Sequence, residues 1–137
     1  MSKKVVIAGS ASLKKKMQKW VDFWEAKSDH EVIDYPNPID KSKMLTEYPK
    51  VHQEFFRNLT RADLVFVANE DKGGVRGYIG AETFAELAFA VAQNLVYGKN
   101  IEIILAKMPS EKVQSFDEIN LWLELGWIKL AKERVAA

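Results

Sequence analysis

Residues 63–68, DLVFVA, are the stretch that decides the fold. After the aspartate, both alternations of this run are apolar, which is the pattern of a strand that is covered on both faces. Residues 4–8, KVVIA, and residues 101–106, IEIILA, are similarly short and rich in branched side chains. Because strands of this kind are typical of parallel sheets, the three runs predict the centre of one parallel sheet.

Helical periodicity fills the segments between these runs. The pattern predicts a further strand and four helices, namely a strand over residues 31–35 and helices over residues 13–27, 48–60, 80–97 and 116 to about 134, the last with Gly126 as an interruption. Strands that alternate with helices imply right-handed crossovers and a sheet with helices on both faces. We predict an α/β, flavodoxin-like (Rossmann-like) three-layer sandwich, with four or five parallel strands in the order 2-1-3-4 and a single domain over residues 1–137.

The composition narrows the classes of function. The chain has 137 residues, 47% of them hydrophobic, a net charge of +1 and no cysteine. This excludes a disordered chain, a disulfide framework and a thiolate nucleophile, and the charge gives no attraction to nucleic acid or to a membrane surface. No apolar run approaches the ~20 residues of a membrane-spanning helix, and the basic N-terminus with its short apolar run does not resemble a signal peptide. We expect a cytoplasmic protein whose partners include neither a nucleic-acid polymer nor a membrane.

The topology predicts where a ligand would bind. In such sheets the site lies at the carboxyl ends of the strands, where the winding reverses between the first and third strands. Three segments would meet there: the turn over residues 9–12, the loop after Tyr35, and the loop over residues 69–79 that leads to Gly80. The candidate binding residues in these segments are Gly9, Ser10, Ser12, Tyr35, Asn69, Tyr78 and Gly80.

The turn over residues 9–12 has two interpretations. Its backbone N–H groups and the hydroxyls of Ser10 and Ser12 could form a cradle for a phosphate, next to three consecutive lysines. Alternatively, one of the serines simply provides the N-cap of a helix with a solvated basic face. The chain has neither a complete P-loop nor a Rossmann glycine fingerprint, and it has only two histidines, so we expect no cofactor and no metal site.

Two glutamates stand out in residues 77–90, GYIGAETFAELAFA. Glu82 and Glu86 are four positions apart and therefore share one face of the predicted helix. The helix dipole or solvent exposure is enough to explain Glu82, which lies close to the helix start. Glu86 is surrounded in sequence by alanine, leucine and phenylalanine, so its carboxylate needs a partner, a ligand or water.

This stretch resembles the signature of the nucleoside 2-deoxyribosyltransferase-like family. The positions that match are Gly77, Tyr78, Ile79, Gly80, Ala81, Thr83, Glu86, Leu87 and Ala90. The IAGS at residues 7–10 and the ADLVFVAN at residues 62–69 are similar to the first turn and the third strand of the family. The resemblance thus covers about residues 4–106 and supports the predicted fold.

The resemblance implies an activity and roles for particular residues. Family members cleave the N-glycosidic bond of a nucleoside or nucleotide, by transfer to a second base or by hydrolysis, and Glu86 matches their nucleophile, which forms a glycosyl-enzyme ester. Asp63 matches an acid that helps to bind or protonate the leaving base, and Ser10 and Ser12 match a turn that holds a 5′-phosphate. The family also implies a dimer or larger homo-oligomer, for which the apolar residues 121–131, LWLELGWIKLA, are the candidate contact.

The chain also departs from the family pattern. Val6 replaces a tyrosine of many transferases, Phe89 replaces a second tyrosine, and Gly80 replaces an acid. Glu82 occupies the position of a serine, and its charge would repel a phosphate while leaving a role in substrate binding open. Two alternatives therefore remain: a non-catalytic module that binds a nucleotide or sugar nucleotide on the same fold, and an interaction protein with no small ligand.

Overall fold

The computed structural model describes residues 2–132 and shows a five-stranded parallel sheet in the order β2-β1-β3-β4-β5. The strands are β1 (Lys3–Ala8), β2 (His30–Asp34), β3 (Leu64–Val67), β4 (Glu102–Leu105) and β5 (Lys129–Leu130). This confirms the predicted α/β, flavodoxin-like fold and strand order, and it adds β5 beside β4.

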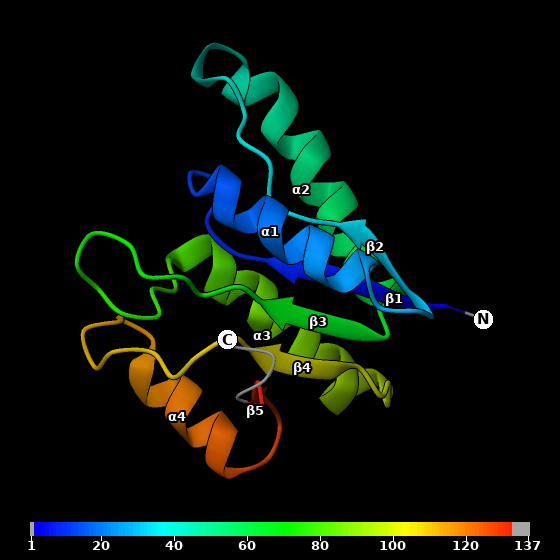
Figure 1. Cartoon of the computed structure of the whole chain (residues 1–137), viewed down its shortest axis with the longest axis vertical. Coiled ribbons are helices and arrows are strands. Elements are labelled where there is room, and N and C mark those ends of the chain that lie inside the picture. Colours follow the sequence, from blue (N-terminus) through cyan, green and yellow to red (C-terminus); the bar gives the residue numbers. More distant parts are fainter. Residues whose placement is uncertain (1, 133–137) are drawn as a thin grey trace.

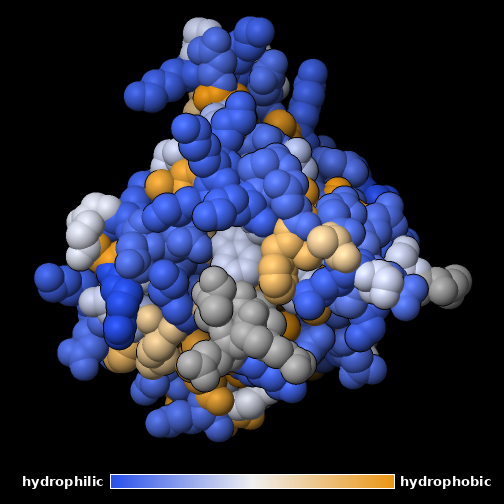
Figure 2. Space-filling model, in the orientation of Figure 1, coloured by the Kyte–Doolittle hydropathy of each residue, from blue (hydrophilic) through white to orange (hydrophobic). Residues whose placement is uncertain are grey.

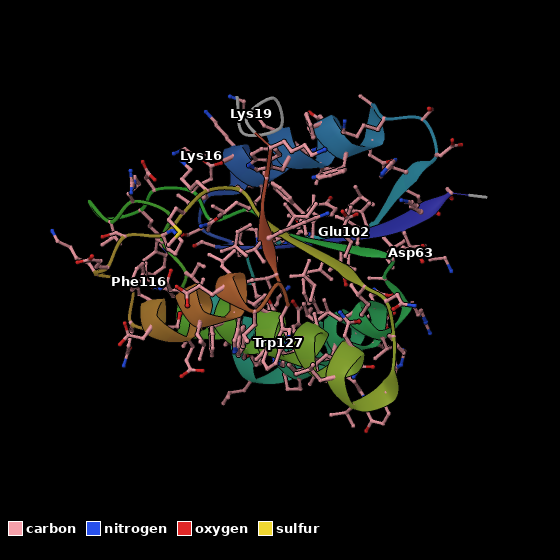
Figure 3. All side chains as sticks on the ribbon, turned by 90° about the horizontal axis from the view of Figure 1, so that it is seen from below. Lys16, Lys19, Asp63, Glu102, Phe116 and Trp127 are labelled. Atoms are coloured by element: carbon pink, nitrogen blue, oxygen red, sulfur yellow. The ribbon has the colours of Figure 1, made fainter. Side chains whose placement is uncertain are left out.

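Helices cover both faces of the sheet, as predicted. They are α1 (Lys14–Glu25), α2 (Met44–Arg61), α3 (Ala81–Tyr97) and α4 (Phe116–Glu124), with a short 3₁₀ helix, η1 (Lys41–Lys43), before α2. Helix α1 packs on one face, and α2, α3 and α4 pack on the other (Figures 1 and 3). Strands β1 and β3 are neighbours in the sheet, but the chain continues from β1 to β2 on one side and from β3 to β4 on the other. The crossovers that follow these two strands therefore lie on opposite faces of the sheet.

Two apolar cores explain why the strand sequences have no polar alternation. In β1, Val6 belongs to the core under α2 and α3, whereas Val5 belongs to the core under α1. In β3, Val65 belongs to the core under α2 and α3, and Phe66 belongs to the core under α1. These two side chains, like those of Val5 and Val6, are fully buried. Both faces of each strand therefore need apolar residues, and this produces the continuous runs that predicted the sheet.

Two predicted helix boundaries were wrong. The last helix ends at Glu124, and Gly126 follows with a φ of 76°, after which the chain extends into β5. The end of that predicted helix, beyond residue 132, lies outside the described residues. Helix α2 begins at Met44 instead of Tyr48, and it includes the exposed Pro49, whose ring removes one intrahelical hydrogen bond.

The C-terminal apolar stretch contributes partly to the core and partly to the surface. Trp122 stacks on Phe84 of α3 at 5.4 Å and 18°, so its ring serves internal packing. The exposed members of the stretch are Leu121, Leu125, Trp127 and Leu130. The face of the molecule shown in Figure 2 is mostly hydrophilic, with apolar residues in small scattered groups. The homo-oligomer stays a prediction.

Within the part of the chain that the structure describes, no helix combines the length and the apolar character needed to cross a bilayer.

Candidate functional site

A cavity of about 160 Å³ opens at the carboxyl ends of β1 and β2, between α2 and α3. It is lined by Gly9, Ala11, Tyr35, Pro36, Asn37, Ile39, Met44, Tyr48, Val51, His52, Phe55, Glu82 and Glu86. The first turn and the loop after β2 thus meet there, as the topology predicted. The loop over residues 69–79, the third predicted segment, contributes no lining residue, and α3 lines the cavity in its place. The loop after β2 and the start of α2 project from the body at the top of Figure 1 and form the outer wall.

Glu86 is the buried ionisable group of this cavity. Its side chain is on the second turn of α3, and the residue is only 5% exposed. Among residues 2–132 its carboxyl group has no hydrogen bond or ion pair with another side chain or with the backbone. Burial raises its pKa to about 8, with further contributions from the negative charges of Glu82 and Asp34. At neutral pH, Glu86 is therefore mostly protonated.

Glu82 lies one helical turn before Glu86 and is exposed at the mouth of the cavity. It does not cap α3, whose N-cap residue is Gly80 and which has no side-chain cap. Across the mouth, burial raises the pKa of the Tyr48 hydroxyl, and contact with the Glu82 carboxylate raises it further. Glu82 and Tyr48 therefore connect α3 to α2 at the entrance.

Asp34 is a third acid near the cavity, and the sequence analysis did not identify it. It is the last residue of β2, and its carboxylate accepts hydrogen bonds of 2.9 Å from the Asn58 amide and from the Tyr35 N–H. Burial nevertheless raises its pKa, because these two bonds do not fully replace water. Its position at a strand end, two residues before Pro36, was the signal that could have drawn attention to it.

Aromatic rings form the wall on α2. Tyr48 and His52 stack at 4.9 Å, with their planes 15° apart, and His52 meets the edge of Phe56 at 4.4 Å. Phe56 in turn contacts Phe89 of α3 at 4.9 Å. These three ring contacts hold the Tyr48 and His52 side chains against the body of the protein. The helical spacing of Tyr48, Val51 and Phe55 was visible in the sequence, but it could be read only as core.

Gly9 lies at the floor of the cavity, as predicted, and it is buried. A Cβ atom there would be 2.8 Å from the Met17 sulfur and 3.1 Å from the Ala68 carbonyl oxygen. The methionine could shift, but the carbonyl belongs to the backbone. A larger residue would require both neighbours to move, so this position favours glycine where the chain leaves β1 close to the end of β3.

Ser10 and Ser12 lie beside the cavity and not in its lining. Their hydroxyls are 3.0 Å apart, and the Lys72 ammonium donates a 2.7 Å hydrogen bond to Ser10. The expectation that one of them caps the helix was wrong, because α1 has Leu13 at its N-cap and no side-chain cap. The two serines and Lys72 thus gather at the rim next to Gly9.

Asn69, Tyr78 and Gly80, which were predicted binding residues, support the site from outside the cavity. The buried Asn69 amide donates to the carbonyls of Lys107 and Gly77 and accepts from the Lys107 N–H at 3.2 Å. The Tyr78 hydroxyl lies 2.9 Å from the place where a Cβ atom of Gly80 would be. These contacts hold the loop that leads into α3.

Asp63 is not part of this site. It precedes β3, where its carboxylate accepts a 2.8 Å hydrogen bond from the Lys4 N–H. Figure 3 shows Asp63 beside Glu102 at the end of the sheet opposite to Lys16, which is on the first turn of α1. The expectation of an acid close to Glu86 therefore does not hold for Asp63, because a residue before a parallel strand lies at the amino edge of the sheet.

Comparison with known proteins adds no identification. No protein-family model matches the chain, and no curated protein matches it significantly. The function must be argued from the geometry of the site.

Proposed function

We propose that this protein cleaves the N-glycosidic bond of a nucleoside or nucleoside 5′-monophosphate, by hydrolysis or by transfer to a second base, with Glu86 as the nucleophile. The observation that carries the proposal is the position of Glu86: a residue only 5% exposed, whose carboxyl group lies on the wall of a cavity without a protein partner in the described chain. The sequence around it, GYIGAETFAELAFA, resembles the nucleoside 2-deoxyribosyltransferase-like signature.

The chemistry needs a carboxylate beside the anomeric carbon. Cleavage of the bond to the base builds positive charge on the sugar, and a carboxylate at that point stabilises the charge and then forms an ester. Because the pKa of Glu86 is about 8, its proton must leave before the attack. A substrate that places positive charge near Glu86 would favour the ionised form.

The other residues at the cavity would bind the remaining parts of the substrate. Glu82 at the mouth offers acceptors for sugar hydroxyls, and Tyr35 and Tyr48 offer aromatic surface for a base. Ser10, with the Lys72 ammonium at 2.7 Å, is placed between two lining residues, so a 5′-phosphate at the rim would meet a cation there. The proposed orientation puts the sugar next to Glu86 and the phosphate toward the first turn.

A binding module is the second candidate. Asp63, the acid expected to assist the leaving base, lies at the opposite edge of the sheet, and Glu86 is mostly protonated at neutral pH. Without an acid for the base and without an ionised nucleophile, the same cavity would bind a nucleoside without cleaving it.

Product release distinguishes the two candidates. The protein would be incubated with ribo- and deoxynucleosides and their 5′-monophosphates, with and without a second base, and free base and exchanged nucleoside would be separated by chromatography. We expect turnover in the wild type, loss of at least about a hundredfold in Glu86→Gln, and no change in Glu25→Gln, an exposed acid at the far end of α1. Thermal stabilisation by a nucleoside without any product would favour the binding module. Turnover that persists in Glu86→Gln would overturn the nucleophile.

A further inference from the structure

Acidic, aromatic and aliphatic side chains line the cavity, and among its lining residues in the described chain there is no lysine or arginine. Glu82 and Glu86 line it, and Asp34 is near enough for its charge to raise the pKa of Glu86. His52 is the one lining side chain that could gain a positive charge, and its ring is stacked on Tyr48. The electrostatic environment therefore favours a ligand with positive charge over a neutral one.

We propose that the substrate of this site is a nucleoside whose base carries a fixed positive charge, such as an N-glycosylated pyridinium ion. The sugar lies next to Glu86, and the charged ring lies against Tyr35 and Tyr48. The inference rests on the proposed function, because it names the substrate class of the same cavity.

The state of Glu86 is the first independent support. Glu86 is a residue only 5% exposed, and its carboxyl group has no hydrogen-bond or ion-pair partner among the described residues, so its ionisation is unfavourable. A ligand cation in the cavity supplies the missing partner and offsets the repulsion from Glu82 and Asp34. Binding of a cation thus converts Glu86 into the ionised form that the attack requires, whereas a neutral nucleoside leaves it protonated.

The shape and the walls favour an organic cation. In residues 2–132 no group of three or more histidine, aspartate or glutamate side chains is arranged to hold a metal ion. Tyrosine rings attract organic cations through their faces. The volume of about 160 Å³ is close to the roughly 150 Å³ that encloses one benzene molecule, so the cavity takes one ring of a nucleoside and leaves the other at the mouth.

A charged base also removes the need for an acid. The bond between C1′ and the ring nitrogen breaks with both electrons moving to nitrogen, and the pyridinium leaves as a neutral pyridine. A carboxylate oxygen of Glu86 forms the ester bond to C1′. Water then attacks C1′, the ester bond returns its electron pair to Glu86, and one proton passes to solvent. No step requires protonation of the base, which agrees with the position of Asp63 far from the cavity.

A matched pair of probes tests the inference. The N-ribosyl cation of nicotinamide and its 1,4-dihydro form have nearly the same size, but only the first is charged. Affinity would be measured by calorimetry at low and high salt, and cleavage by release of the free heterocycle, with uridine and thymidine as further neutral substrates. We expect the cation to bind at least about tenfold more tightly than the dihydro form and to release a proton from the protein on binding.

Variants separate the charge effect from general damage. Glu82→Gln should reduce the affinity for the cation severalfold more than the affinity for the dihydro form, which carries the same sugar, whereas Glu25→Gln should alter neither affinity. Tight binding of the cation without cleavage would support the charge preference and refute the proposed function. Cleavage of neutral nucleosides at least as fast as the cation would refute the charge preference and leave the proposed function standing. Absence of binding by every probe would overturn both.

Discussion

Glu82 and Glu86 lie one turn apart on α3 and line the same cavity, but Glu82 is exposed whereas Glu86 is 5% exposed. The exposed carboxylate keeps its water, and its charge disfavours ionisation of the buried one. Two carboxyl groups of the same chemical type thereby acquire different protonation behaviour from their environment alone. The difference has consequences for stability and for activity that can be measured separately.

The stability of the protein should fall as the pH rises from 4.5 to 8. Glu86 has an ordinary pKa of 4.5 in the unfolded chain and a pKa of about 8 in the folded one, so the folded state holds an extra proton in this window. Its contribution is complete below pH 4.5 and is lost as the pH rises through 8, at up to ~1.4 kcal/mol per pH unit.

The Glu86→Gln variant isolates this effect because it carries no proton to lose. Urea unfolding of both proteins would be measured at pH 5, 6.5 and 8. From pH 5 to pH 8, the free energy of unfolding of the variant should rise by ~1–4 kcal/mol relative to that of the wild type. The other titrating groups, Asp34 included, are present in both proteins and largely cancel in the difference. A difference that does not vary with pH would show that Glu86 ionises normally.

If Glu86 is the nucleophile, kcat/KM for an uncharged nucleoside should increase with pH and level off above about 8. This parameter reports the free protein, in which the carboxyl group must first lose its proton. Glu82→Gln removes one repelling charge and should move the midpoint to lower pH, whereas Glu25→Gln should not. A rate that decreases through the same range would instead assign Glu86 the role of a proton donor.

The fold could be predicted from the sequence because β1 and β3 are buried on both faces. Neighbouring residues such as Val5 and Val6 belong to different cores. Both alternations of these strands are therefore apolar, and the sequence shows them as uninterrupted apolar runs. Strand β5 has only two residues, both exposed, and so lacks any pattern that a reader could detect. A strand of this length is defined by its pairing with β4, which is a property of the tertiary structure.

Only part of the site could be predicted from the sequence. Glu86 was predicted from a carboxylate in an apolar setting, which is local information. Asp34 and Tyr48 come from β2 and α2, far from Glu86 in the sequence, and only the tertiary structure brings them near it. Asp63 illustrates the opposite error: a match to a family position was given more weight than the rule that a residue before a strand lies at the amino edge.

Asp63→Asn should therefore leave turnover and nucleoside affinity within about twofold of the wild type. The variant retains an oxygen that can accept from the Lys4 N–H, so the expected loss of stability is only ~0.5–1.5 kcal/mol. Kinetic assays and thermal unfolding would be run on the same preparation. A tenfold or greater loss of turnover with an unchanged melting temperature would restore a functional role to Asp63.

Two glycines with positive φ provide a matched test of the loop before α3. Gly77 has a φ of 61°, and a Cβ atom there would be 2.9 Å from the Pro109 Cα, whereas Gly74 has a φ of 78° with open space around it. Gly74→Ala should cost ~1–2 kcal/mol for the left-handed conformation alone, and Gly77→Ala should cost ~1–3 kcal/mol more because of the clash. Equal losses of unfolding free energy would mean that the loop yields at Gly77 without strain.

Asp34 should act on Glu86 through its charge. Replacement of Asp34 by asparagine keeps the shape and removes the negative charge, so the pKa of Glu86 should fall. The midpoint of the kcat/KM profile for an uncharged nucleoside, and the pH window in which stability is lost, should both move to lower pH. Since the amide that replaces the carboxylate still has an oxygen to accept from the Tyr35 N–H, the fold should persist.

Glu54→Gln is the control for Asp34→Asn. Glu54 also lies near Asp34, but its carboxylate is exposed on α2 and pairs with Arg57 at 2.9 Å. Solvent screens this charge, so the variant should leave both pH midpoints in place. If Asp34→Asn shifts neither midpoint while Glu86→Gln still abolishes the pH dependence of stability, burial and Glu82 alone set the protonation of Glu86. If both midpoints move together, one proton on Glu86 governs the stability and the activity of the site.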